Sequence, residues 1–264
     1  MLRASDVWFA YDRAPVLRGV GLTVPRGAIV GILGPNGSGK TTLLRVLAGT
    51  RQPQRGTVTL DDAPLVAFAR GTLARRMAVV PQETHLAFDY TVAEVTMMGR
   101  YPHLGAFEIE GPGDVAIVEE TLASTGTLHL KDRQFATLSG GEKQRVVIAA
   151  ALAQIQAESA TRTADAGFLL LDEPTASLDL GYQLEVAALL RRLHDERRVT
   201  VLISTHDLAL AGTLCDRLLM IRDGEVVADG DTDRVLDTAN IRTVFGVDAD
   251  VLQVSGRRVV VPRA

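Results

Sequence analysis

The chain has 264 residues, of which 47% are hydrophobic and 23% are charged, and its formal net charge is -4. This composition is typical of a globular protein with enough chain to bury a sizeable core. The acidic balance argues against nucleic acid or an acidic membrane surface as the partner of the whole chain. The single cysteine, Cys215, excludes an internal disulfide and fits a reducing compartment.

The sequence offers no segment that would cross a membrane. The first residues lack the apolar core of a signal peptide, and no run approaches the roughly 18 apolar residues that span a bilayer. The longest candidate, 146–155, is interrupted by Gln154. If the protein works at a membrane, we expect another chain to supply the span.

The apolar pattern predicts an α/β core with a helical insertion. Up to residue 83, short apolar runs predict strands, with one helix over 41–49 that Gly49 closes. From 84 to 167 only helices are predicted, and 168–264 returns to alternating strands and helices; 156–167 is expected to be a solvated connection. The later predicted elements are helices over 91–100, 114–126, 141–158 and 182–197, strands over 168–172 and 199–207, a hairpin over 217–230, and two strands around 255–256.

A glycine-rich turn lies between the apolar run 28–33 and the first helix, and it matches the pattern G-x-x-x-x-G-K-[ST]. Its glycines allow backbone N–H groups to approach phosphate oxygens, and the helix start adds partial positive charge. Lys40 is predicted to reach the β- and γ-phosphates of a nucleotide, and the Thr41 hydroxyl to bind Mg²⁺. The predicted nucleotide-binding residues of this turn are Gly34, Pro35, Asn36, Gly37, Ser38, Gly39, Lys40, Thr41 and Thr42.

Polar residues follow three other apolar runs. Asp172 ends one run as a predicted Mg²⁺ ligand, and Glu173 beside it is predicted to polarise the attacking water. Taken alone, two acids after an apolar run are equally explained by a strand that meets its surface loop, and the glycine-rich turn is what favours the metal site. His206 ends a second run, where a contact with the γ-phosphate or the water and a purely structural role both remain open. Gln82 follows a third run and would touch Mg²⁺ or the water, although a simple surface glutamine is the better explanation from this residue alone.

The stretch LSGGEKQR, residues 138–145, precedes a helix-like run. Ser139 and Glu142 fit a capping box, which explains a helix start without any ligand. The adjacent glycines Gly140 and Gly141 weaken a first helical turn by about 0.5–1 kcal/mol each. They are therefore expected where another group approaches the backbone closely, and an anion is the natural candidate.

In this order, GPNGSGKTT, Gln82, LSGGEKQ, LLLDEP, SLD (177–179) and STH resemble the motifs of the ATP-binding cassette family of transporter ATPases. The resemblance covers nearly the whole chain. It implies one domain with a P-loop NTPase (RecA-like) core, formed by 1–83 and 168–264 and including an antiparallel β subdomain, and a helical insertion over 84–167. It also implies ATP as the substrate and Mg²⁺ as the metal.

The resemblance further implies a head-to-tail homodimer of cassettes. In that dimer Ser139, Gly140 and Gly141 of one chain would contact the γ-phosphate on the P-loop of the other, and Asp179 would contact the partner directly. The helix after the signature usually carries an Arg where this chain has Ala150, and the connection that follows is longer than is typical. Neither departure touches the catalytic set.

The catalytic roles within one chain follow from the same resemblance. Glu173 would be the general base, His206 the γ-phosphate sensor and Lys40 a catalytic cation. Gln82 would link catalysis to the membrane subunit, and Tyr11 would stack on adenine, although Trp8 and Phe9 lie close by in the sequence.

The run TVAEVTMMGRYPHLGAF, 91–107, is similar to the ATPases of importers for iron–siderophore, haem and cobalamin, and ALAQIQAE with its long connection favours the haem branch. A plain turn after a docking helix is the alternative explanation of GRYPH. The importer resemblance implies two transmembrane permease subunits, an extracytoplasmic substrate-binding protein acting indirectly, and a peripheral position on the cytoplasmic face of the membrane.

Two other functions are less favoured. A soluble cassette that acts on ribosomes or DNA generally carries two cassettes or a long coiled coil, and this chain has neither. An exporter cassette is often fused to its membrane span, and GRYPH also argues against it.

Overall fold

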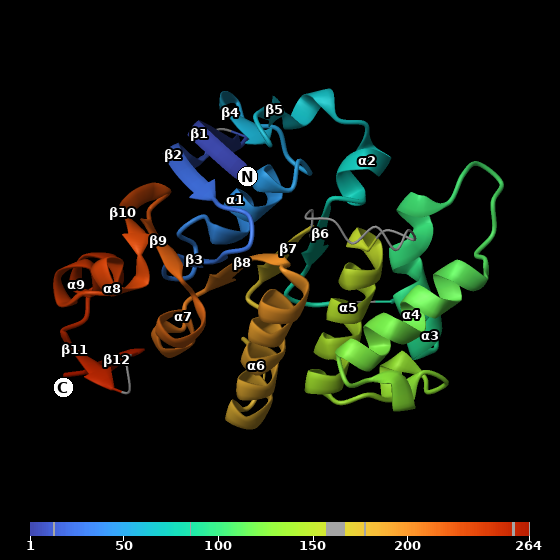
Figure 1. The fold of residues 1–264 in the computed structure, drawn as a ribbon. Coiled ribbons are helices and arrows are strands. Elements are labelled where there is room, and N and C mark those ends of the chain that lie inside the picture. The colour runs from blue at the N-terminus through green and yellow to red at the C-terminus, as the bar shows by residue number, and fades with distance from the viewer. Residues whose placement is uncertain (13, 85, 157–166, 177, 255–256, 264) are drawn as a thin grey trace. The chain divides into compact units, whose positions relative to one another are not determined.

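The computed structural model describes residues 1–264 except 13, 85, 157–166, 177, 255–256 and 264 (Figure 1). Contacts divide the chain into two compact units, one formed by Met1–Ala67 with Thr200–Ala264 and the other by Phe68–Val199. Most of the predicted connection 156–167, the serine of the SLD motif and the turn 255–256 lie outside the described residues. The predicted insertion limits, 84 and 167, remain a prediction.

The first unit contains an antiparallel sheet in the order β2-β1-β4-β5. In β1 the side chains of Leu2, Ala4, Val7 and Phe9 are buried, and most of the residues between them are exposed. That alternation is typical of a sheet with one covered face. The bounds are β1 Leu2–Tyr11, β2 Ala14–Val24, β4 Arg55–Leu60 and β5 Ala63–Pro64.

The first unit also contains parallel strands, in the order β10-β9-β3-β8. Every residue of β3 (Ile29–Leu33) and β8 (Thr200–Thr205) is buried, because both strands lie inside a covered sheet. β3 runs parallel to β8 and to β9, and β10 is antiparallel to β9. The other elements of this unit are α1 Lys40–Leu47, η1 Leu65–Ala67, α7 Leu208–Leu214, β9 Arg217–Arg222, β10 Glu225–Asp231, α8 Thr232–Val235, α9 Thr238–Phe245, β11 Ala249–Val254 and β12 Arg257–Pro262.

The second unit combines a pair of parallel strands with helices. β6 (Met77–Val80) pairs with β7 (Phe168–Asp172), and the described residues between these strands form helices, turns and one isolated bridge. The helices of the unit are α2 Arg70–Ala74, α3 Val92–Met97, η2 Met98–His103, α4 Pro112–Ser124, η3 Leu128–Leu130, η4 Phe135–Thr137, α5 Gly140–Ile155 and α6 Leu180–Arg197. The predicted α/β class with parallel and antiparallel strands is confirmed.

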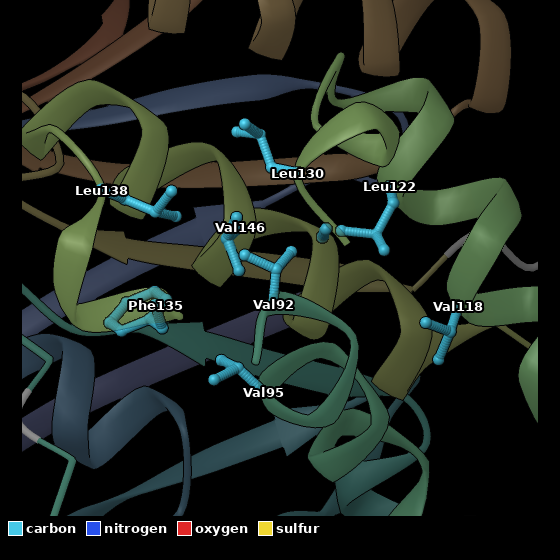
Figure 2. Packing of buried hydrophobic residues seen from close by; sticks show 9 residues of the cluster. Val92, Val95, Val118, Leu122, Leu130, Phe135, Leu138 and Val146 are labelled. Atoms are coloured by element: carbon cyan, nitrogen blue, oxygen red, sulfur yellow. The ribbon is translucent and has the colours of Figure 1, made fainter. Parts of the chain in front are cut away.

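Helices α3, α4, η3, η4 and α5 of the second unit share one apolar core (Figure 2). Figure 2 shows Val92 and Val95 of α3, Leu122 of α4 and Val146 of α5 together, with Leu138 entering just before α5 begins. Burying such side chains stabilises by about 1.5–3 kcal/mol each. The core therefore fixes the N-terminal end of α5, which carries the predicted signature.

Two predicted helices are wrong in their bounds. The helix expected over 91–100 ends at Met97 and continues as the 3₁₀ helix η2, which contains Pro102. The helix expected over 141–158 ends at Ile155, and Gln156 is extended. The guanidinium of Arg100 stops that helix, since it donates to the carbonyl oxygens of Ala153 and Gln156, both at 2.6 Å.

Across the described residues, no helix is both long enough and apolar enough to cross a membrane.

Candidate functional site

The glycine-rich turn 34–42 follows β3 and opens α1, as predicted. A Cβ on Gly34 would lie 2.3 Å from the Ile221 carbonyl oxygen, so no side chain fits at this position. Gly39, the N-cap of α1, has a φ of 104°, which is a left-handed conformation that favours glycine. The turn is thus close-packed backbone, with its N–H groups available at the start of a helix.

Lys40 curls back over this turn. Its Nζ donates to the carbonyl oxygens of Gly34 at 2.8 Å and Pro35 at 3.0 Å, and the residue is only 4% exposed. A buried ammonium and the N-terminus of α1 place positive charge at the same turn. This is the charge distribution that binds phosphate groups.

The hairpin between β9 and β10 braces the turn. The N–H of Gly224 donates to the Ser38 carbonyl oxygen at 3.1 Å, and the Gly224 carbonyl oxygen accepts from the Arg18 N–H at 2.9 Å. Gly224 has a φ of 82°, and a Cβ there would lie 2.2 Å from the Val16 carbonyl oxygen. The sequence predicted a turn at this glycine but not its support of the phosphate loop.

The donor set of the turn fits a nucleotide with Mg²⁺. Ser38 Oγ is buried and has no hydrogen-bond partner among the described residues, although it lies on the turn between Gly37 and Gly39. A buried hydroxyl without a partner is rare unless a ligand satisfies it. The half-buried hydroxyl of Thr41 adds an oxygen ligand of the kind that Mg²⁺ prefers.

Tyr11 ends β1 and contacts α1. Its hydroxyl lies 3.5 Å from Arg45 Nη1, and hydrogen bonds with the side chains of Thr42 and then Arg45 lower the pKa of Tyr11. The two other aromatic candidates are already engaged: Phe9 is buried, and the guanidinium of Arg55 lies 5.8 Å from the centre of the Trp8 ring. Tyr11 therefore keeps its place as the stacking candidate.

His206 lies at the same edge of the sheet as the turn. It follows the last residue of β8, and Thr205 pairs with Leu33, the last residue of β3. The N–H of Gly34 also donates to the Thr205 carbonyl oxygen at 3.4 Å. The first unit thus brings together Tyr11, the turn 34–42 and the exposed His206, as expected for carboxyl ends of parallel strands.

Asp172, Glu173 and Gln82 lie at or just after the ends of neighbouring strands, at one edge of the β6–β7 pair in the second unit. Val80 of β6 pairs with Leu171 of β7, so the segments that follow the two strands leave the same edge. Asp172 is buried at the end of β7, and Gln82 is exposed two residues after β6. Glu173 has a φ of 44°, a conformation that costs a non-glycine residue energy and is concentrated at functional sites.

The signature begins α5 as a capping box, as predicted. Ser139 is the N-cap, its hydroxyl accepts from the Glu142 N–H at 3.3 Å, and Glu142 Oε2 accepts from the Ser139 N–H at 2.8 Å. The hydrogen bonds that the Glu142 carboxylate accepts from the Ser139 N–H and then from the Ser139 side chain lower the pKa of Glu142. Asp179 is likewise an N-cap, of α6, where Oδ1 accepts from the Tyr182 N–H at 3.1 Å.

The structure adds two contacts that sequence reasoning missed. The ring of Tyr182 occupies the space where a side chain at Gly141 would lie, so a group of the same chain approaches this glycine. Arg100, noted only as part of GRYPH, is fully buried, and its Nε donates to Asp114 at 2.8 Å. An arginine in an apolar context gives little sequence signal for burial, because most arginines are exposed.

Comparison with known proteins places the chain in a family. Residues 17–176 match the model of the ABC transporter family. The hemin import ATP-binding protein HmuV of Bordetella pertussis is 41% identical over 251 residues, which cover 95% of this chain and 94% of that protein. The cobalamin import ATP-binding protein BtuD of Halobacterium salinarum is 40% identical over 240 residues, which cover 91% of this chain and 57% of that protein.

Two solved structures resemble the fold. An inward-facing metal-chelate type ABC transporter matches with a TM-score of 0.84 at 26% identity, over 100% of this chain and 97% of that chain. A bacterial ABC transporter cassette described as dimeric matches with a TM-score of 0.72 at 27% identity, over 88% of this chain and 99% of that one. This chain therefore belongs to the ABC transporter family, and its fold is that of the ATP-binding cassette.

Proposed function

We propose that this chain is the ATP-hydrolysing subunit of an importer that takes up haem, another iron chelate or cobalamin through separate transmembrane subunits. The observation that best supports ATPase activity is the turn 34–42, where the buried Lys40 folds over the backbone and the Ser38 hydroxyl has no partner among the described residues. The cargo class is supported by relatives named for hemin and for cobalamin import. Haem is favoured because the stretch ALAQIQAE and its long connection resemble that branch.

Phosphate binding and charge neutralisation would come from Lys40 and the N-terminus of α1. Thr41, Asp172 and Gln82 would hold Mg²⁺, which when bound neutralises further phosphate charge. The phosphates would replace the carbonyl oxygens that Lys40 Nζ now contacts. Tyr11 would stack on the adenine.

The water would be activated by Glu173, which follows the buried Asp172 directly. The carboxylate would accept the proton of a water that attacks the γ-phosphorus in line, with ADP as the leaving group. His206 would hold the γ-phosphate in line for this attack.

A second copy of the chain would complete each site. The N-terminus of α5 at Ser139, Gly140 and Gly141 would contact the γ-phosphate bound by the partner's P-loop, and Asp179 would contact the partner's loop. A related cassette described as dimeric supports this arrangement. We infer a homodimer that closes on ATP and reopens after hydrolysis.

The membrane contact would lie in GRYPH and the segment that follows it, residues 99–109. The side chains of Tyr101, Phe107 and Ile109 are exposed there, which is unusual for three large apolar residues so close in sequence. We propose that the two permease subunits dock on this segment at the cytoplasmic face. The extracytoplasmic binding protein would act only through them, and nucleic acid is not a partner.

The general-base role is tested by Glu173→Gln. Hydrolysis is expected to fall by about 10²–10⁴-fold while ATP binding persists, because only the proton acceptor is lost. Turnover and nucleotide affinity would be measured on the purified chain. Glu196→Gln, an exposed residue of α6, removes the same charge and should leave turnover unchanged; equal turnover in both variants would remove Glu173 from this role.

The trans-contact role is tested by Ser139→Asp. Aspartate caps a helix as well as serine does, so α5 should keep its stability. Its negative charge would repel the partner's γ-phosphate, and hydrolysis should be lost with ATP binding intact. Thr91→Asp is the matched control, since Thr91 caps α3 in the same capping-box geometry. Ser139→Arg should also abolish hydrolysis, by obstructing the partner's phosphate.

The cargo is tested in proteoliposomes that contain the complete importer and its binding protein. Haem should stimulate ATP hydrolysis more than cobalamin or a ferric siderophore. Stimulation by RNA or DNA without any membrane subunit would instead favour a soluble cassette.

A further inference from the structure

The first turn of α5 rests against the first turn of α6 through Gly141 and Tyr182. A Cβ on Gly141 would lie 2.3 Å from Cδ1 and 2.6 Å from Cγ of the Tyr182 ring. Side chains do not approach each other so closely, so the ring packs directly on the backbone of the signature turn. Gly140, which is exposed, would meet only Leu178 Cδ2, at 3.3 Å.

Tyr182 is also bonded to the other predicted trans contact. Its N–H donates to Asp179 Oδ1 at 3.1 Å, and this bond caps α6. One residue therefore contacts the signature turn with its ring and Asp179 with its backbone. Ser139 is the N-cap of α5 and Asp179 is the N-cap of α6. The ring of Tyr182, a residue of α6, lies between these two helices.

Further contacts hold α5 and α6 together along their length. Arg145 Nη1 lies 2.6 Å from Glu185 Oε2, and Arg197 Nη1 donates to Gln156 Oε1 at 3.1 Å beyond the end of α5. The contacts follow the same order along both helices, so the helices run parallel, side by side as Figure 1 shows. The two helices are therefore joined at their start, middle and end.

We infer that Tyr182 is a positioning residue for ATP hydrolysis, and that residue 141 is glycine because of the Tyr182 ring rather than because of a phosphate. The ring sets where the N-terminus of α5 points and keeps Ser139 and Asp179 at one separation. Both N-caps then meet the partner subunit in a single closing step. This inference rests on the proposed function, in which those residues contact the partner's nucleotide and loop.

A double-mutant cycle tests the inference. Gly141→Ala should lower kcat by roughly 10²-fold, because the new methyl group displaces the ring and with it the signature turn. Tyr182→Ala should lower kcat by about tenfold with little change in the ATP concentration at half-maximal rate, because ATP binds elsewhere on its own chain. Gly141→Ala/Tyr182→Ala should be about tenfold more active than Gly141→Ala alone, because the methyl group then has room.

Tyr182→Phe keeps the ring and should keep wild-type kcat. Gly140→Ala serves as the matched glycine control, and its effect should be the same in the wild-type chain and in the Tyr182→Ala chain. A double variant no more active than Gly141→Ala would overturn the inference, since the glycine would then serve the phosphate. A Tyr182→Ala enzyme within about twofold of wild type would also overturn it.

Urea unfolding of the same proteins separates this inference from the proposed function. Gly141→Ala should lower the unfolding midpoint when Tyr182 is present and raise it in the Tyr182→Ala chain, because alanine favours a helix once the clash is gone. The same shift in both backgrounds would overturn the ring packing. If the wild type hydrolyses no ATP, the proposed function fails and this comparison still decides the packing.

Discussion

At the scale of the residue, the backbone of Glu173 distinguishes it from the other glutamates that the structure describes. Among the described residues, most non-glycine residues with positive φ are aspartates, which tolerate that conformation well, whereas Glu173 is a glutamate. A residue in this region costs about 1–3 kcal/mol, which the surrounding structure must offset. The conformation lies immediately after the buried Asp172, where the predicted water-activating carboxylate is needed.

This conformation gives a prediction about stability. Glu173→Gly should be more stable than Glu173→Ala by about 1 kcal/mol, because alanine keeps the Cβ that disfavours positive φ. At Glu185, within α6, the order should be the opposite: Glu185→Ala should be more stable than Glu185→Gly by about 1 kcal/mol, since glycine is the poorer helix former. Urea unfolding of the four variants measures both differences. The same order at the two positions would mean that Glu173 is not strained.

At the scale of the element, α5 is defined by polar groups at both ends. Ser139 and Glu142 satisfy its first N–H groups, and Arg100 satisfies the carbonyl oxygens of Ala153 and Gln156. His103 Nε2 lies 2.8 Å from the Gln154 carbonyl oxygen, and a Cβ on Gly99 would lie 2.1 Å from that of Ala150. The GRYPH segment therefore packs against the end of the signature helix, close to the alanine that replaces the usual arginine.

The buried pair of Arg100 and Asp114 yields a pH-dependent prediction. Arg100 Nε lies 2.8 Å from Asp114 Oδ1. The hydrogen bond from Arg100, followed by that from the Gly111 N–H, lowers the pKa of Asp114. At pH 7, Asp114→Asn should destabilise the fold by about 3–5 kcal/mol, because it leaves a buried guanidinium without its counter-charge. The free energy of unfolding, from urea titrations at several pH values, measures this.

The sign of the pH dependence follows from the direction of that shift. Because the folded-state pKa lies below the ordinary value of 3.8, the wild type keeps this stabilisation above 3.8 and loses it as the pH falls through the folded-state pKa. The difference in free energy of unfolding between the wild type and Asp114→Asn should therefore become smaller below pH 3.8. Glu119→Gln breaks the exposed ion pair with Lys131. Its free energy of unfolding should not differ measurably from that of the wild type at any pH.

At the scale of the whole molecule, the proposed sites need two chains. Glu173→Gln should elute as a dimer in gel filtration with MgATP and as a monomer without it. ATP that is not hydrolysed would stay bound between the P-loop of each chain and the LSGG turn of the other, and so keep the two chains together. Adding Lys40→Ala to this variant should prevent the dimer by preventing ATP binding. Adding Ser139→Arg should prevent the dimer while ATP still binds, and a dimer without nucleotide would contradict the shared sites.

The sequence by itself determined the parts of this protein whose physics is local. The glycine-rich turn, the apolar runs of β3, β7 and β8, and the capping box at Ser139 each depend on residues adjacent in the chain, and the structure has them where the sequence predicts. The carboxyl ends of parallel strands then had to carry His206 and Asp172 at sheet edges.

Only the tertiary structure decided what depends on distant partners. The end of α5 is bonded to Arg100, which contacts residues more than fifty positions away along the chain. The space at Gly141 is filled by Tyr182 of another helix, which neither periodicity nor propensity encodes. Such contacts are set by which side chains the shared core brings together, and that packing is a property of the folded chain rather than of any local stretch.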